Sequence, residues 1–135
     1  MIAIIGGSGF VGSRIISSLN TESVYNLDKN PSLDYENITS IVNIEYKDQI
    51  IFHPKTKIVI LLAAEHKDNV TPTSKYYDVN VKGTRNVLNQ MDEVGIKHII
   101  FTSSVAVYGL NKTNPNENST IDPFNHYGKS KWGAE

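Results

Sequence analysis

The sequence predicts an α/β protein with a doubly wound, mostly parallel sheet of about five strands. Three observations lead to this prediction. Short apolar runs alternate with stretches of helical periodicity, the run at 57–64 is nearly continuous, and glycines crowd the junction between the first strand and the first helix. Alternation of this kind is typical of parallel sheets, and a continuous apolar run is typical of a strand covered on both faces.

The first part of the chain is expected to supply three strands and one helix. Ile2–Ile5 is a short buried strand, and Phe10–Asn20 has apolar residues at helical spacing. Val24–Leu27 is the second strand, and Ile41–Tyr46 is the third. We expect a turn or a degraded helix in Asn30–Ser40, between these two strands.

The remaining elements follow the same alternation. Lys57–Ala64 is the fourth strand and His98–Ser104 the fifth, with a helix at Ser74–Glu93 between them. Thr73 or Ser74 is expected to cap this helix and Gly95 to end it, with an apolar face formed by Tyr77, Val81, Leu88 and Met91. After a polar loop at Asn111–Asn118, a last helix begins near Asn125.

The composition limits the classes of function. At 135 residues the chain is expected to form one domain, and its net charge of −1 gives no global field for nucleic acid. There is no cysteine, the four histidines lack metal-ligand spacing, and no apolar run approaches the length of a membrane span. We therefore expect a cytoplasmic protein that binds no metal, nucleic acid or membrane.

The glycines at the first strand–helix junction predict a dinucleotide site in a Rossmann-type fold. Gly6, Gly9 and Gly12 are spaced three residues apart. In this context the first glycine permits a tight turn, the second lets the backbone approach a pyrophosphate, and the third allows close helix–strand packing. The N-terminus of the helix then faces the phosphates.

Asp28 supports this interpretation, because it ends the second strand. An acid at this place accepts hydrogen bonds from the ribose hydroxyls of the adenosine and repels a 2′-phosphate. We therefore expect NAD rather than NADP. The alternative for Asp28 is a turn residue before Asn30 and Pro31.

Tyr127 and Lys131 form the second chemical pattern. Four residues apart near the start of a helix, they share one face. A lysine ammonium beside a phenol stabilises the phenolate, so that the tyrosine can act as a general base or acid. A surface pair is the alternative, but the helix follows the fifth strand, at the sheet edge where ligands bind in such folds.

These motifs resemble the extended short-chain dehydrogenase/reductases, and specifically the NAD-dependent epimerase/dehydratase family that acts on nucleotide sugars. The matching segments occur in order and cover essentially the whole chain: GGSGFVG at 6–12, Asp28, Asp48 in YKDQ, LLAAEH at 61–66, YYDVNVKGT at 76–84, FTSSVAVYG at 101–109 and YGKSK at 127–131.

The resemblance implies a set of cofactor contacts. The backbone N–H groups of Phe10 and Val11 would bind the pyrophosphate, Asp28 the ribose and Asp48 the adenine amino group. Further cofactor contacts would come from Leu62, Ala63 and Ala64 of the fourth strand, from His66 after it, and from Asn80 of the long helix. A hydrogen bond between helix and loop is the alternative for Asn80.

The resemblance also implies the catalytic residues. Ser104, with Ser103 as the alternative if the register slips by one, would orient the reacting sugar hydroxyl. Tyr127 would take the proton of that hydroxyl as hydride leaves for the nicotinamide, and Lys131 would bind the nicotinamide ribose. Val105 and Ala106 stand where dehydratases of the family often carry an acidic pair, which favours an epimerase or reductase.

The length of the chain departs from the family, whose members are considerably longer and carry a C-terminal domain that grips the sugar nucleotide. Residues 1–135 are therefore expected to be an incomplete NAD(P)-binding Rossmann domain without specific turnover, with the fifth strand at an exposed sheet edge. The resemblance implies a homodimer through the long helix and the helix near Tyr127. The alternatives are a non-catalytic dinucleotide-sensing module of the same fold and a fragment that binds nothing.

Overall fold

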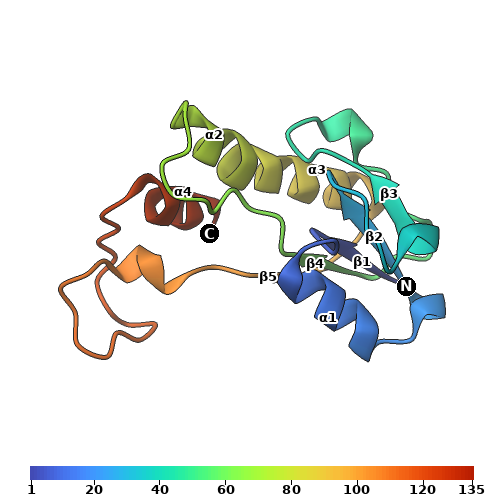
Figure 1. The fold of residues 1–135 in the computed structure, drawn as a ribbon, viewed down its shortest axis with the longest axis horizontal. Helices are drawn as coiled ribbons and strands as arrows, with labels where there is room; N and C mark the ends of the chain where they lie inside the picture. Colours follow the sequence, from blue (N-terminus) through green and yellow to red (C-terminus); the bar gives the residue numbers. More distant parts are fainter.

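The computed structural model describes residues 1–135 and shows a five-stranded, entirely parallel sheet with helices on both faces (Figure 1). The strands are β1 Ile2–Ile5, β2 Val24–Asp28, β3 Thr39–Ile41, β4 Ile58–Leu61 and β5 His98–Phe101. Their order is β3-β2-β1-β4-β5. The predicted fold class is therefore confirmed, and β5 lies at an edge of the sheet.

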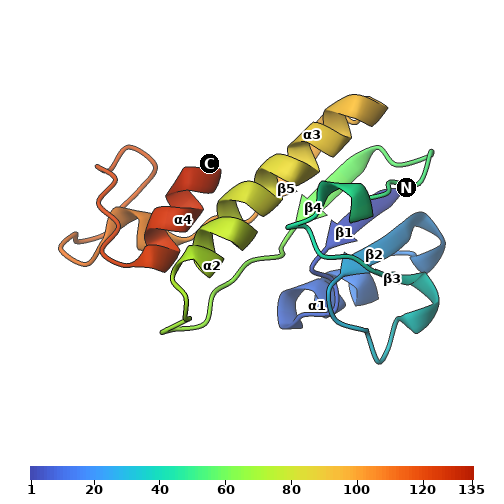
Figure 2. The same cartoon turned by 90° about the horizontal axis from the view of Figure 1, so that it is seen from above.

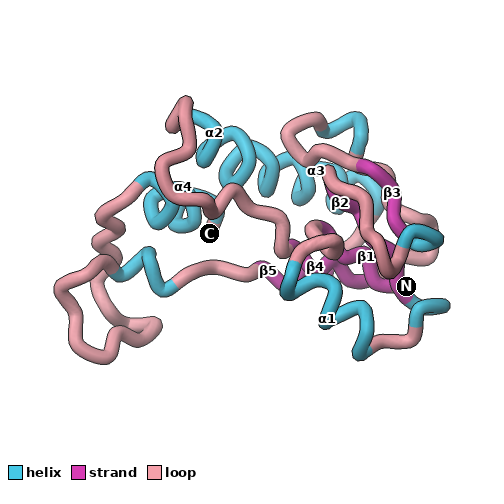
Figure 3. Tube along the Cα trace, in the orientation of Figure 1, coloured by secondary structure: helices cyan, strands magenta, loops and turns pink.

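Helix α1 (Phe10–Ser18) covers one face of the sheet, and one long helix covers the other (Figures 1 and 3). The long helix consists of α2 (Ser74–Tyr77), a π-helical stretch (Asp78–Gly83) and α3 (Thr84–Val94). The last helix, α4 (His126–Ala134), lies beside α2 (Figure 2). None of these helices combines the length and the apolar character that crossing a bilayer requires.

The central strand β1 explains why both faces need helices. Successive side chains of a strand point to opposite faces. Ala3 and Ile5 belong to the larger buried cluster, which includes Val87 and Met91 of α3. Ile4 belongs to the smaller cluster, together with Ile16 of α1, Val24 and Ile60. A strand buried on both sides has the apolar sequence seen here.

The third strand was predicted wrongly at Ile41–Tyr46. Strand β3 covers Thr39–Ile41, and the chain then leaves the sheet. Val42 and Ile44 are buried in the larger cluster between the sheet and the long helix, although they are not in a strand. The side-chain amide of Asn86 donates hydrogen bonds to the carbonyls of Ile44 (2.9 Å) and Glu45 (3.1 Å). A loop and turn with alternating burial, held against a helix, therefore have the sequence pattern of a strand.

The apolar face predicted for the long helix was also wrong in part. The side chains that pack against the sheet are buried, namely Val79, Val87 and Met91, whereas Leu88 is 39% exposed. The predicted Tyr77 and Val81 face α4 instead. The Tyr77 hydroxyl is 3.0 Å from Nδ1 of His126, and a Cβ built on Gly133 would lie 3.2 Å from Val81. This helix has two packed faces, and only Met91 was assigned to the correct one.

The ends of the elements were predicted with mixed success. Gly95 ends α3 in a left-handed conformation (φ 78°), as expected. Asn125 caps α4 by accepting a hydrogen bond from the N–H of Gly128 (2.8 Å). Thr73, however, makes no side-chain capping bond at the start of α2. Strands β4 and β5 end at Leu61 and Phe101, so the residues after them are loops that can line a site.

Two glycines inside helices provide a matched test of the packing. A Cβ at Gly12 would lie 2.4 Å from the Cα of Gly7, which is backbone, whereas a Cβ at Gly83 would lie 2.8 Å from side-chain atoms of Ile44, which can adjust more easily than backbone. We expect Gly12→Ala to lower the free energy of unfolding by about 2 kcal/mol, because the helix must shift. Gly83→Ala should stay within about 1 kcal/mol of wild type, since alanine's helix propensity offsets the crowding. Urea unfolding measures the free energy of unfolding of both variants. An equal decrease in Gly12→Ala and Gly83→Ala would contradict the prediction.

Candidate functional site

The turn after β1 is built by close backbone contacts. Gly6 has a φ of +93°, which favours glycine, and its N–H donates to the carbonyl of Leu27 (2.9 Å). A Cβ on Gly6 would lie 2.6 Å from the backbone nitrogen of Ala63, after β4. The turn predicted at Gly6 and the close packing predicted at Gly12 are therefore both present.

The N-terminus of α1 carries free hydrogen-bond donors. Its first helical hydrogen bond runs from the N–H of Ser13 to the carbonyl of Gly9 (2.9 Å), and the N–H groups of Phe10, Val11 and Gly12 have no acceptor in the chain. A helix N-terminus with free N–H groups favours anions. Gly9, directly before them, has no side chain to cover them.

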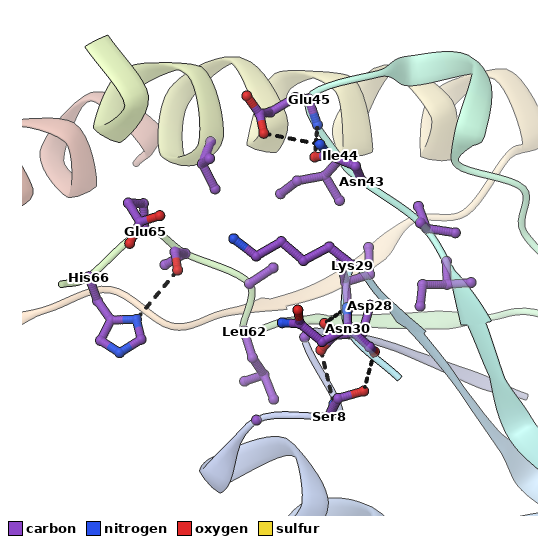
Figure 4. Close-up of a pocket in the computed structure, with 18 of the residues that line it drawn as sticks. Ser8, Asp28, Lys29, Asn30, Asn43, Ile44, Glu45, Leu62, Glu65 and His66 are labelled. Atoms are coloured by element: carbon purple, nitrogen blue, oxygen red, sulfur yellow. Dashed lines mark hydrogen bonds between the residues drawn. The ribbon is translucent and has the colours of Figure 1, made fainter. Parts of the chain in front are cut away.

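A cavity of about 420 Å³ lies at the carboxyl ends of β1, β2 and β4 (Figure 4). This is the switch point of the strand order, where parallel sheets bind ligands. The polar and apolar residues that line it include Gly6, Ser8, Gly9, Asp28, Lys29, Asn30, Asn43, Ile44, Glu45, Leu62, Ala63, Ala64, Glu65 and His66.

Asp28 lies in this cavity and is held by two backbone donors. Its carboxylate accepts hydrogen bonds from the N–H of Ser8 (3.0 Å) and of Asn30 (2.8 Å). A carboxylate can accept about four hydrogen bonds, so it retains capacity for a ligand. The Lys29 side chain extends across the same cavity, as Figure 4 shows.

A second cavity of about 300 Å³ joins the glycine turn to α4. It shares five lining residues with the first cavity, namely Gly6, Gly9, Leu62, Ala64 and His66. Its other lining residues are Phe10, Val11, Gly12, Thr102, Ser103, Tyr127 and Lys131. The structure thus brings the glycine turn and the Tyr127/Lys131 pair, which are distant in sequence, to one site.

Lys131 is buried, with only 2% of its surface exposed. Its ammonium nitrogen lies 4.2 Å from the centre of the Phe101 ring. Burial lowers its pKa to about 8, against the opposing effect of the Glu135 carboxylate. The side chain is therefore still largely protonated at pH 7, and it gives the second cavity a positive charge.

The two candidate serines have different surroundings. Ser103 lines the second cavity, and its hydroxyl donates to the Glu135 carboxylate. Ser104 lines neither cavity, and its Oγ accepts a hydrogen bond from the N–H of Ala106 (3.2 Å) at the start of a 3₁₀ turn. In this structure the alternative residue, Ser103, is the one that lies with Tyr127 and Lys131.

Asp48 and Asn80 lie away from the two cavities. Asp48 is in a 3₁₀ turn at Lys47–Gln49, well past the end of β3, and lines neither cavity. Asn80 is buried, and its amide is used within the chain. It accepts from the N–H of Glu65 (2.8 Å) and donates to the Glu65 carbonyl (3.0 Å) and to Oγ of Ser130 (2.8 Å).

Sequence reasoning missed several residues around the site. Asn43, Ile44 and Glu45 line the first cavity because the chain leaves the sheet after β3, which the incorrect strand assignment hid. Asn26 is fully buried in β2 and its side chain accepts a hydrogen bond from the N–H of Gly7 (2.8 Å). A single amide within the apolar strand VYNLD was a signal that could have identified it.

Comparison with known proteins agrees with this architecture. The model of the NAD-dependent epimerase/dehydratase family matches residues 2–135. The chain is 56% identical over 138 aligned positions to the N-acetyl-α-D-glucosaminyl-diphospho-ditrans,octacis-undecaprenol 4-epimerase of Escherichia coli O157:H7, covering 99% of this chain and 41% of that protein.

Two solved structures at 26% identity superpose on 99% of this chain. A UDP-galactose 4-epimerase does so with a TM-score of 0.86, and 48% of its chain is covered. A short-chain dehydrogenase/reductase superfamily protein from Agrobacterium tumefaciens, crystallised with bound NAD, has a TM-score of 0.84 and 42% coverage. The chain thus spans less than half the length of these relatives. On the match of its sequence to the family model, the chain belongs to the NAD-dependent epimerase/dehydratase family.

Proposed function

We propose that the chain forms the NAD-binding and proton-transfer part of an enzyme that epimerises a sugar attached to a diphosphate. The observation that carries this proposal is that Tyr127 and Lys131 line the same cavity as the glycine turn and the free N-terminus of α1. The names of the relatives favour 4-epimerisation, and in both the E. coli protein and the UDP-galactose 4-epimerase the sugar is joined to a diphosphate.

The residues present suit NAD. The free N–H groups of Phe10 and Val11 would bind the pyrophosphate, with Gly9 leaving room for it. Asp28 would accept hydrogen bonds from the ribose hydroxyls of the adenosine. Beyond Asp28 the first cavity continues to Asn43, Ile44 and Glu45, so the adenine would lie there rather than beside Asp48, the residue that the family resemblance implies.

The nicotinamide end would lie in the second cavity, along Leu62 and Ala64, whereas Ala63 lines only the first cavity. When bound, NAD⁺ supplies a hydride acceptor that can also return the hydride. Tyr127 would remove the proton of the sugar hydroxyl while the carbon loses its hydride, and would give the proton back when the hydride returns to the other face. The Lys131 ammonium would stabilise the phenolate and bind the nicotinamide ribose.

A serine would orient the sugar hydroxyl toward Tyr127. Ser104 is the residue that the family resemblance implies, and Ser103 is the one that lines the cavity. Asn80 would act indirectly, because its bond to Ser130 and the bond from Ser130 Oγ to the Tyr127 carbonyl (2.8 Å) hold the first turn of α4. This replaces the direct cofactor contact that was expected of Asn80.

Calorimetric titration of the chain with NAD⁺ and NADP⁺ tests the cofactor. We expect NAD⁺ to bind more tightly, because the Asp28 carboxylate accepts from the ribose and repels a 2′-phosphate. In Asp28→Asn the preference for NAD⁺ should fall about tenfold or more. Asp34→Asn, which removes the same charge from an exposed position, is the control and should keep the preference. If the chain does not bind NAD⁺, the proposed function is wrong.

Tyr127→Phe tests the general base. Turnover is measured in a chimera in which this chain replaces the matched segment of the E. coli relative, with the substrate named for that protein. We expect kcat to fall about 10²- to 10⁴-fold while NAD⁺ affinity stays unchanged, since the hydroxyl alone is removed. Ser103→Ala and Ser104→Ala in the same chimera identify the serine that orients the hydroxyl. Undiminished turnover in Tyr127→Phe would refute the assignment of Tyr127 as the general base.

Lys131 should make stability depend on pH. Its folded-state pKa is about 8 and its ordinary value 10.5, so the unfolded chain binds more protons between these values. The free energy of unfolding of the cofactor-free chain should therefore rise from pH 8 to pH 10.5. Below pH 8 Lys131 is protonated in both states, so the cost of burying its charge no longer changes with pH. Lys131→Met should lack this rise, whereas Lys129→Met, exposed on the same helix, should retain it. Urea unfolding across this range gives the comparison; parallel curves for all three proteins would refute it.

A further inference from the structure

Asn26 is a buried polar side chain that the proposed mechanism does not use. It lies in β2, between apolar neighbours, and is 0% exposed. It lines neither cavity. A buried amide is costly unless its hydrogen bonds are all made, so its partners indicate what it does.

All the hydrogen-bonding capacity of the Asn26 amide nitrogen is directed to the cofactor turn and the neighbouring strand. Nδ2 donates to Oγ of Ser8 (3.0 Å) and to Oγ1 of Thr39 on β3 (3.0 Å). Oδ1 accepts from the N–H of Gly7 (2.8 Å). One side chain therefore joins β2, β3 and two consecutive residues of the glycine turn.

The direction of these bonds requires an amide. The Ser8 hydroxyl already donates its one proton to the carbonyl of Asn30 (2.9 Å), and the Thr39 hydroxyl donates to the carbonyl of Tyr35 (2.6 Å). Each oxygen can then only accept at Asn26. Only a side chain with two N–H donors and one acceptor satisfies Ser8, Thr39 and Gly7 together. A carboxylate of the same shape would lack both donors.

Gly7 is the steric counterpart of this amide. A Cβ at Gly7 would lie 2.3 Å from Oδ1 of Asn26, so the turn can come this close only without a side chain. The N–H of Gly7 is thereby turned inward to β2, whereas the N–H groups of Phe10 and Val11 remain free at the cavity. The two sets of donors lie on one short segment, so fixing the first set orients the second.

We propose that Asn26 is a positioning residue that holds the glycine turn in the conformation that binds the dinucleotide pyrophosphate. This inference rests on the proposed NAD site. Asn26 acts through Gly7 and Ser8 and touches no ligand itself. Its loss should therefore weaken NAD⁺ binding beyond what a general loss of stability would cause, and should not alter the chemical step.

The test compares Asn26→Leu with Tyr25→Phe. Tyr25→Phe is the matched control, because it removes the hydrogen bonds of the neighbouring β2 side chain with Oγ1 of Thr56 (2.7 Å) and with the N–H of His53 (3.0 Å), which lie away from the glycine turn. The Kd for NAD⁺ is measured by calorimetry at a temperature at which circular dichroism shows each variant folded. We expect Asn26→Leu to raise Kd about tenfold or more and Tyr25→Phe to leave it within twofold.

Two further measurements separate positioning from stability. Amide exchange of the Gly7 N–H should speed up in Asn26→Leu while that of Ile4 in β1 is preserved. Thr39→Val removes one partner of Asn26 outside both cavities and should raise Kd severalfold. If Asn26→Leu does not fold, Thr39→Val replaces it in the test. Unchanged NAD⁺ affinity of Thr39→Val would then refute the role of Asn26.

In the chimera, Asn26→Leu should raise the KM for NAD⁺ and leave kcat at saturating NAD⁺ unchanged. Normal NAD⁺ affinity in a folded Asn26→Leu, or an equal loss in Tyr25→Phe, would overturn the role of Asn26 alone. A wild-type chain that fails to bind NAD⁺ would overturn the proposed function and this inference with it.

Discussion

The contact between the first turn of α1 and the glycine turn after β1 is the constraint on which the rest of the site depends. Gly12 sits against the backbone of Gly7 and Gly6, at distances that leave no room for any side chain. This close approach fixes α1 on the sheet and directs its free N–H groups to the carboxyl ends of β1 and β4. Both cavities lie where that helix N-terminus points, and both are lined by Gly6 and Gly9.

Two buried asparagines support this arrangement from opposite sides. Asn26 secures the glycine turn to β2 and β3, and Asn80 secures the loop after β4 to α4. Asn80 lies in the π-helical stretch between α2 and α3, a type of irregularity that often occurs at functional sites. Loops are held here by side-chain amides, since an amide can donate and accept at once.

The sequence predicted the parallel fold, the glycine turn and the position of α4, because each depends on local signals. Apolar strands, a glycine with positive φ and an Asn cap can be recognised without knowledge of distant contacts. The strand after Asp28 and the packed face of the long helix were wrong for one reason. Val42, Ile44 and Tyr77 pack against elements that are remote in sequence, and periodicity does not reveal which partner an apolar residue will meet.

In the candidate site, too, some features could be predicted from the sequence and others depend on contacts that are remote in sequence. The proximity of Tyr127 and Lys131 to the glycine turn could be inferred from the topology of a parallel sheet. The orientation of Ser103 and Ser104 could not, because it is set by the 3₁₀ turn that begins at Val105. The position of Asn43 follows from the end of β3 at Ile41, and Asn86 of the distant helix α3 holds the segment after it by a hydrogen bond to the Ile44 carbonyl.

The strand order also has a consequence for how the chain acquires its structure. Ile2 of the central strand pairs with Val24 on one side and with Ile58 on the other, and Ile58 pairs in turn with His98. Every pairing closes a long loop before it gains contacts, which slows folding in proteins dominated by non-local pairs. The most apolar strands therefore stay exposed until distant segments arrive, and apolar strands exposed in this way favour aggregation during folding.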